Sequence, residues 1–150
     1  MERKYSKWIK ERDTLHMVSS ECMDLVRTIE SNLAEKEGIF SEWSLKDLIA
    51  HIIGWEREAI IRYNAYLEGP SENVRYNINS FNKKSVASRK HLSWIDMLDE
   101  LKSAQDEFER INCRLNAANI NSDKRFESWI KILIKHYMHH NSQIKEKFKI

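Results

Sequence analysis

Glycine, proline and cysteine are scarce in this chain of 150 residues, which has three glycines, one proline and two cysteines. Glycine and proline mark most turns, so a fold made of many short strands and tight turns is disfavoured. Aliphatic residues instead recur every three or four positions, which is the period of an amphipathic helix. The sequence therefore predicts an all-α protein.

The two cysteines, Cys22 and Cys113, are far apart and each falls within a helical apolar pattern. Cysteines in such a pattern commonly behave as small hydrophobic residues. We expect both to be buried in the core, with a disulfide or a reactive thiol as the alternatives.

Long hydrophobic runs are also missing. No stretch approaches the ~20 apolar residues of a membrane-spanning helix, and residues 1–7 lead into no apolar run of signal-peptide length. The formal net charge of +2 is too small to indicate a nucleic-acid or membrane partner. With 41% hydrophobic and 32% charged residues, the composition is typical of a globular chain. We expect one cytoplasmic domain over residues 1–150.

The first amphipathic helix is clearest over residues 15–33, where apolar side chains form a continuous stripe. Trp8 and Ile9 extend the pattern backwards, because nothing between them and Asp13 forbids a helix. Gly38 is expected to mark the end of this element.

The second helix is predicted to begin after Ser44, a good N-cap, with Asp47 in the acidic position of a capping box. It should run to about Leu67, because Gly69 and Pro70 follow and stop a helix.

Three further segments complete the chain. Residues 71–80 read as a loop and residues 81–90 as a short helix. A third long helix follows the cap residue Ser93 and fades in the turn formers of residues 116–122, and a fourth covers residues 124–148. Four such helices, with a connection between the second and third long enough to cross over, predict a four-helix bundle.

Histidines provide the main chemical signal. His136 and His140 are four residues apart, so a helix places them on one face, and His51 on the second helix could supply a third ligand. Three neutral imidazoles suit zinc or nickel and leave a coordination position open for water or a thiol. Spacing alone leaves a second interpretation open, in which these are edge-of-core histidines bonded to backbone or carboxylate. His16 and His91 are expected at the surface.

Other candidate residues have two interpretations each. Glu56 falls in the middle of an apolar stripe, where a carboxylate needs a partner. It could accept a hydrogen bond from a ligand imidazole, act as a general base, or pair with a Lys or Arg. Tyr137 is expected to pack in the core. Trp43 and Trp55 could line the mouth of a groove or pack against the core, and His139 should face solvent.

Several short motifs, in this order, resemble the DinB-like (YfiT-like) superfamily, and more closely its ClbS/DfsB branch. Residues 43–56 match the pattern W-S-x-x-D-x-x-x-H-x-x-x-W-E, and residues 81–82 and 92–94 are also similar to that branch. Residues 136–140 match H-Y-x-x-H, and residues 140–144 match the ending H-x-x-Q-I. The likeness covers roughly residues 10–148.

The resemblance implies a four-helix bundle in which His51, His136 and His140 face a groove. In the superfamily this triad often binds a divalent metal, and some members are thiol-dependent transferases or isomerases that use mycothiol, bacillithiol or glutathione. ClbS-type relatives are associated with self-protection by hydrolysis of a reactive cyclopropane group.

For this chain we therefore expect a metal-dependent hydrolase or thiol-dependent transferase that acts on a small electrophile. Zinc or nickel would bind the three histidines, a low-molecular-weight thiol could take part, and Glu56 is the candidate catalytic residue. The alternative is a protein that binds and sequesters a reactive small molecule without turnover. Superfamily members often dimerise, so a homodimer is a further expectation.

Overall fold

The structure is a computed structural model that describes residues 2–150 of the chain. Over these residues every regular element is helical, and the sole β feature is an isolated bridge between Phe40 and Trp43. The predicted all-α class is confirmed. The helices are α1 (Glu2–Arg27), α2 (Ser31–Ala34), α3 (Leu45–Glu68), α4 (Ile78–Arg89), α5 (Trp94–Arg114), α6 (Ala117–Ser122) and α7 (Arg125–Phe148).

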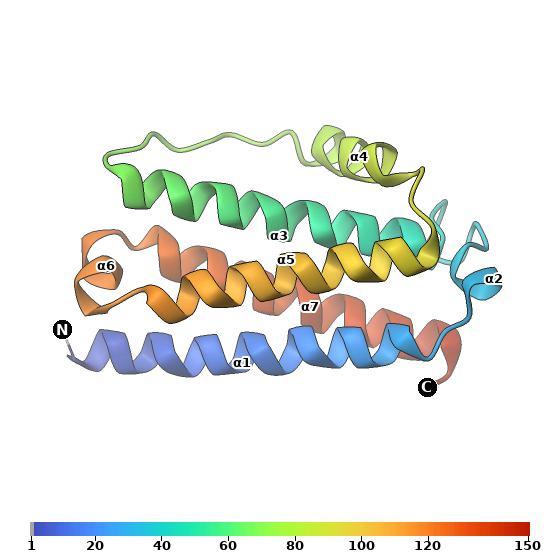
Figure 1. Cartoon of the computed structure of the whole chain (residues 1–150), viewed down its shortest axis with the longest axis horizontal. Coiled ribbons are helices and arrows are strands. Elements are labelled where there is room, and N and C mark those ends of the chain that lie inside the picture. Colours follow the sequence, from blue (N-terminus) through green and yellow to red (C-terminus); the bar gives the residue numbers. More distant parts are fainter. Residues whose placement is uncertain (1) are drawn as a thin grey trace.

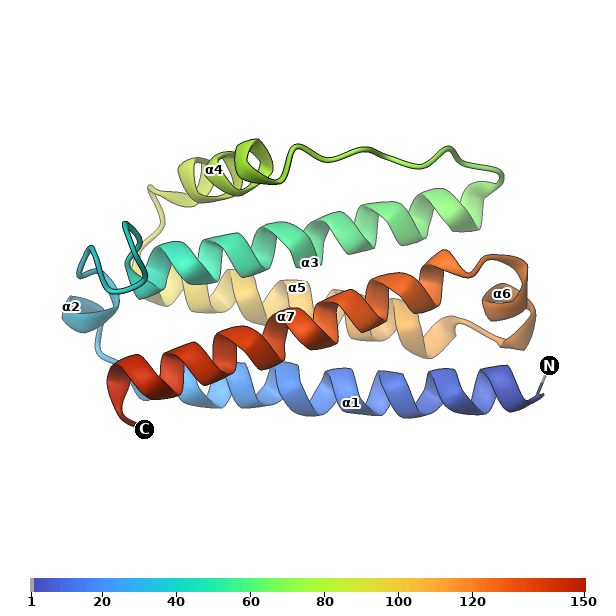
Figure 2. The ribbon, with the colours of Figure 1, turned by 180° about the vertical axis from the view of Figure 1, so that it is seen from behind.

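The four long helices lie side by side along the length of the molecule (Figure 1). Helices α1 and α7 run in one direction, and α3 and α5 run in the other. Because α3 and α5 are parallel, the chain between them must return along the whole molecule. It does so through an extended segment and then α4, both of which lie outside α3 (Figure 2).

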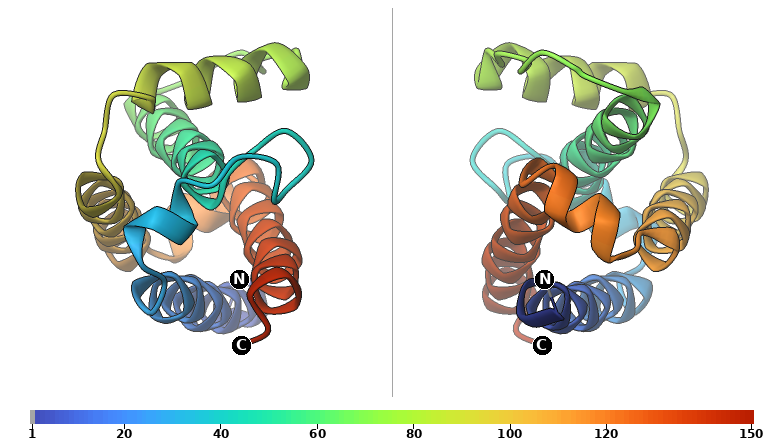
Figure 3. Two further views of the ribbon diagram at one scale, coloured as in Figure 1. Left: turned by 90° about the vertical axis from the view of Figure 1, so that its right-hand side faces the viewer. Right: turned by 90° about the vertical axis from the view of Figure 1, so that its left-hand side faces the viewer.

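The space between the four long helices is filled by apolar side chains. Seen end-on, the four long helices stand around a common centre and α4 covers α3 from outside (Figure 3). The largest fully buried side chains come from α1, α3, α5 and α7: Trp8, Tyr63, Tyr137, Phe108, Phe126, Leu45, Leu48, Ile49, Ile52, Ile53, Met97 and Leu101. Among residues 2–150, no helix is both long and apolar enough to cross a membrane.

The predicted helix starts are confirmed where a cap residue precedes them. The Ser44 hydroxyl accepts a hydrogen bond from the backbone N–H of Asp47 (3.0 Å), and the Asp47 carboxylate accepts one from the N–H of Ser44 (3.1 Å). The Ser93 hydroxyl likewise accepts from the N–H of Asp96 at 3.1 Å. These bonds satisfy backbone donors that have no partner within the helix.

The end predicted for the first helix is wrong. Helix α1 ends at Arg27, and the hydroxyl of the next residue, Thr28, donates a hydrogen bond of 2.7 Å to the Leu25 carbonyl. Gly38 lies in a later turn. Such side-chain bonds compete with the helical ladder. Ile29 and Leu33 continue the helical spacing of apolar residues in the sequence, but neither belongs to α1. Ile29 is buried outside the helix, and Leu33 is 47% exposed.

Two segments predicted as loops are partly helical. Helix α4 begins at Ile78, three residues earlier than expected, because the Asn77 side chain accepts from the N–H of Ser80 (3.1 Å). Residues 117–122 form α6, opened by reciprocal hydrogen bonds between Asn116 and Asn119, each 2.9 Å. Asparagine is a turn former but also a good N-cap, and here the cap decides the structure.

The prediction for the cysteines is half right. Cys22 is buried and Cys113 is exposed, and both are free thiols. Cys113 lies at the end of α5 beside the charged residues Arg110 and Arg114, so its apolar neighbours in the sequence face a different side of the helix.

Helix α4 lies very close to α3 at Gly54. A Cβ atom built there would lie 2.2 Å from the Ser85 Oγ atom and 2.6 Å from its Cβ atom. The next residue, Trp55, stacks its ring on Phe81, which lies one turn before Ser85 on α4, with 4.1 Å between centroids. The missing side chain at Gly54 therefore lets α4 lie directly against the part of α3 that carries His51.

Replacing Gly54 with alanine should destabilise the protein by about 1–2 kcal/mol, because overpacking outweighs the gain in helix propensity of about 1 kcal/mol. Urea unfolding of Gly54→Ala, Ser85→Gly and the double variant measures this. Ser85→Gly removes both clashing atoms, so the alanine should cost less in the double variant than in the wild type. Additive effects of the two substitutions would show that the clash is not there.

Candidate metal centre

Three histidines from two helices meet at one point. His51 projects from the first half of α3, and His136 and His140 project from α7. The Nε2 atoms of His51 and His136 are 2.8 Å apart, those of His136 and His140 3.0 Å, and those of His51 and His140 3.3 Å. His51 and His140 are buried and His136 is half-buried. The structure thus brings together the three residues that the sequence singled out.

The tautomer of His51 is set by its neighbours. Its Nδ1 atom lies 3.0 Å from the Oδ1 atom of Asn82, on α4. The Trp55 indole N–H donates to the same Asn82 atom at 2.9 Å, and an indole nitrogen is a donor only, so this atom is the amide oxygen. His51 must therefore carry its hydrogen on Nδ1, which leaves Nε2 as a bare lone pair aimed at the other two histidines.

His140 is held in the same way. Its Nδ1 atom lies 2.7 Å from the Oε1 atom of Gln143, one turn further along α7. With both Nδ1 atoms donating to amide oxygens, His51 and His140 turn two lone pairs towards each other at 3.3 Å. A hydrogen on Nε2 of His136 could satisfy one of them but not both, whereas a single cation between the three nitrogens would satisfy all.

The spacing of the nitrogens fits a first-row divalent ion. The circle through the three Nε2 atoms has a radius of about 1.8 Å, slightly less than the 2.0–2.1 Å of a zinc–imidazole bond. One such ion could lie at bonding distance from all three nitrogens. The three histidines can therefore hold a metal ion and leave part of its coordination sphere free.

Burial keeps these imidazoles neutral. Together with the positive charge that the neighbouring histidines would carry, burial lowers the pKa of His51 to about 4 and that of His136 to about 3, and burial is the larger cause in both. The pKa of His140 is also lowered by burial. A metal ion binds neutral imidazole, so these ligands are ready at neutral pH without losing a proton first.

Glu56 faces away from the histidines. It is 1% exposed, and its Oε1 atom accepts a hydrogen bond of 2.5 Å from the Tyr137 hydroxyl. Within residues 2–150 its Oε2 atom has no partner. The hydrogen bond to Tyr137 takes the place of both partners expected from the sequence, a ligand imidazole and a basic side chain. Burial raises the pKa of Glu56 to about 7, more than Tyr137 and Arg57 lower it.

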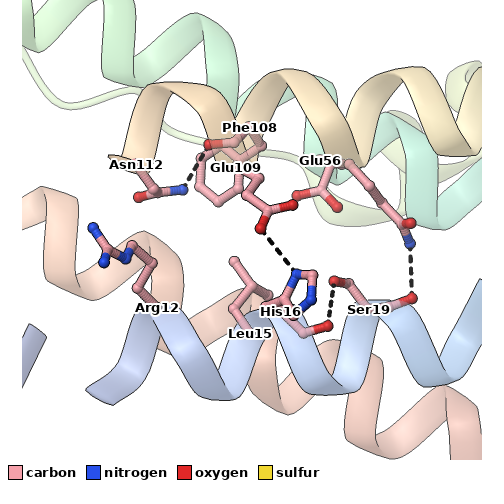
Figure 4. Close-up of a pocket in the computed structure, with 9 residues that line it drawn as sticks. Arg12, Leu15, His16, Ser19, Glu56, Phe108, Glu109 and Asn112 are labelled. Carbon is pink, nitrogen blue, oxygen red and sulfur yellow. Dashed lines mark hydrogen bonds and ion pairs between the residues drawn. The ribbon is translucent and has the colours of Figure 1, made fainter. Parts of the chain in front are cut away.

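The free side of Glu56 borders a small cavity between α1, α3 and α5 (Figure 4). The cavity has a volume of about 20 Å³, which is room for about one water molecule. Its lining is Arg12, Leu15, His16, Ser19, Glu56, Gln105, Phe108, Glu109 and Asn112. A catalytic role for Glu56 stays a prediction, because the structure places its carboxylate at this cavity and not at the histidines.

The structure also shows where the other aromatic and histidine residues singled out from the sequence lie. Tyr137 is 1% exposed, so its core position is confirmed, and Gln105 donates a hydrogen bond of 3.1 Å to its hydroxyl. Trp43 lies against the ring of His51, with 5.1 Å between centroids. His139 faces solvent as predicted, and so do His16 and His91.

Sequence analysis missed the two amides that orient the histidines. Gln143 could have been found, because it follows His140 by three residues and so shares its helix face. Asn82 belongs to a different helix from His51, and no helical spacing connects them. Only the similarity of the Phe81-Asn82 pair to the ClbS/DfsB branch pointed to that position.

A groove leads from the surface to His140. It lies between α4, the C-terminal half of α7 and the turn before α3, and this turn projects between the two helices in the left view of Figure 3. Its volume is about 690 Å³, within the range of small-molecule sites. The lining is Phe40, Ser41, Glu42, Trp43, Leu48, Asn79, Asn82, Lys83, His140, Gln143 and Lys147.

Comparison with known proteins identified no relative of this chain. No model of a protein family matches the chain, and no curated protein or solved structure matches it.

Proposed function

We propose that this protein is a metal-dependent enzyme of the DinB-like, ClbS/DfsB type, with a four-helix bundle crossed over by α4. It would be a hydrolase or a thiol-dependent transferase that acts on a small electrophile. The observation that carries the proposal is the convergence of three Nε2 atoms within 3.3 Å of one another, two of them fixed as lone pairs by amide oxygens.

In this proposal His51, His136 and His140 hold zinc or nickel. When bound, such an ion lowers the pKa of a coordinated water towards ~7 or stabilises a thiolate. The residues of the chain itself bind the small molecule and orient the ligand imidazoles. Asn82 and Gln143 fix the imidazole rings, Trp43 shields His51 from water on one side, and the groove beside His140 admits a small molecule.

A second candidate function, sequestration without turnover, is favoured by the position of Glu56. The carboxylate that the sequence offered as general base is bonded to Tyr137 and not to the histidines. A protein that only captures a reactive ligand needs the groove, with the histidines as its polar lining, but no base.

Turnover with the zinc-loaded protein distinguishes the two functions. The probe is 1-chloro-2,4-dinitrobenzene with L-cysteine as the thiol, followed by absorbance and by mass spectrometry of the products. An enzyme should release many equivalents of thioether per chain, and the variant with all three histidines replaced by alanine should fall to the background rate. One equivalent or less per chain supports sequestration, and equal rates for both proteins contradict the metal-dependent enzyme.

A further inference from the structure

The groove beside the three histidines has a distinctive set of charges. Lys83 on α4 and Lys147 on α7 line it from opposite helices, and Glu42 is the one carboxylate in its lining. All three side chains are exposed. A divalent ion at the histidines would add two further positive charges to the same space.

The two groove lysines differ from two other lysines of the same segments, seven and two residues away in the sequence. Lys90 on the α4 side pairs with Asp47 at 2.9 Å, and Lys145 on α7 pairs with Glu21 at 2.5 Å. Within the part of the chain that the structure describes, Lys83 and Lys147 make no ion pair, although both are close to other charged side chains in sequence. Their ammonium groups are therefore free to meet a ligand.

The wall opposite α4 is a rigid turn. Phe40 and Trp43 exchange backbone hydrogen bonds of 2.9 and 3.0 Å, which closes a two-residue turn over Ser41 and Glu42. Ser41 has a φ of 60°, a conformation that costs a non-glycine residue energy and is often found at ligand clamps. The turn places the Trp43 ring against His51 and forms one wall of the groove.

We infer that the groove takes a small molecule bearing an anionic group, which Lys83 and Lys147 bind while a donor atom of the same molecule reaches the ion at the histidines. This inference rests on the proposed function, since it places one end of the ligand on the metal. The uncharged amides of Asn79 and Gln143 also line the groove. The two lysines and the ion would attract an anionic group and repel a cationic ligand.

Cobalt(II) is the spectroscopic probe for a test by titration. The cobalt-loaded protein is titrated with 3-mercaptopropionate and with its uncharged amide, 3-mercaptopropionamide, and the sulfur-to-cobalt charge-transfer band is followed. Each thiol loses its proton to buffer as it binds. The anionic thiol should bind roughly tenfold more tightly, as two lysines at a partly exposed site would provide.

The variant Lys83→Gln/Lys147→Gln should lose this preference, and 0.5 M salt should weaken it in the wild type. A matched control, Lys10→Gln/Lys124→Gln, removes two lysines at the opposite end of the molecule and should retain it. If the preference survives in the first variant, it arises from chelation of cobalt by the carboxylate, and the inference is wrong. If cobalt does not bind at all, the proposed function fails instead.

Discussion

Zinc added to the metal-free protein is expected to raise its free energy of unfolding by about 4 kcal/mol when free zinc exceeds the dissociation constant 1,000-fold. For a domain of 150 residues, this corresponds to a rise in melting temperature of roughly 8–16 °C. The reason is linkage: only the folded chain brings His51, His136 and His140 together. Differential scanning calorimetry over a series of zinc concentrations, reversed by a chelator, gives the measurement.

Single variants separate the ligands from their surroundings. Alanine at His51, His136 or His140 should remove most of the zinc-dependent stabilisation. His139→Ala is the matched control, because His139 is exposed on the same helix and lies outside the cluster. A zinc-dependent rise of equal size in His139→Ala and His136→Ala would contradict the assignment of ligands.

Asn82→Ala should weaken zinc binding 10–100-fold without removing a ligand, as loss of a hydrogen bond to a ligand imidazole typically does. The cause would be loss of the acceptor that keeps hydrogen on Nδ1 of His51. Asn79→Ala on the same helix has no such bond and serves as its control.

The second large effect concerns Glu56. Glu56→Gln should stabilise the protein more at pH 8.5 than at pH 5, and the two effects should differ by about 3 kcal/mol. This figure follows from 1.36 kcal/mol for each unit by which the pKa of Glu56 differs between the folded and unfolded states. Burial raises the folded-state pKa of this carboxyl from 4.5 to about 7. Between these values the folded state binds more protons than the unfolded state, so the wild type loses stability as the pH rises through 7.

Urea unfolding of wild type and variant between pH 4.5 and 9 tests this prediction. Glutamine keeps the acceptor for the Tyr137 hydroxyl but cannot ionise. Protonation of the three histidines at low pH affects both proteins equally and cancels in the difference. Glu146→Gln, at an exposed position, is the matched control for removal of a carboxylate. A constant difference between wild type and Glu56→Gln across the range would mean that folding does not raise the pKa of Glu56.

Much of the fold could be predicted because its signals are local. Ser44 and Ser93 mark helix starts through side-chain bonds to residues three positions away, and the apolar stripes give the face that each helix buries. The end of α1 could not be predicted from its stripe, because Ile29 is buried by a contact with α5: the Trp94 indole donates to its carbonyl at 3.0 Å. That contact depends on tertiary structure.

Prediction of the candidate site from the sequence is limited in the same way, because the site also depends on tertiary structure. Helical spacing placed His136 and His140 on one face, but the convergence of His51 with them depends on how α3 and α7 are rotated about their axes. The direction of Glu56 depends on the same rotation. A residue five positions after His51 points to the other side of α3, where Tyr137 on α7 meets it.

X-ray absorption at the zinc edge tests the central claim most directly, because it counts the ligands and measures their distances. For the protein loaded with one equivalent of zinc, three imidazole nitrogens at about 2.0–2.1 Å are expected, together with at least one light atom from water or buffer. Two or fewer imidazoles, or a sulfur ligand from a cysteine, would show that His51, His136 and His140 do not form the metal site.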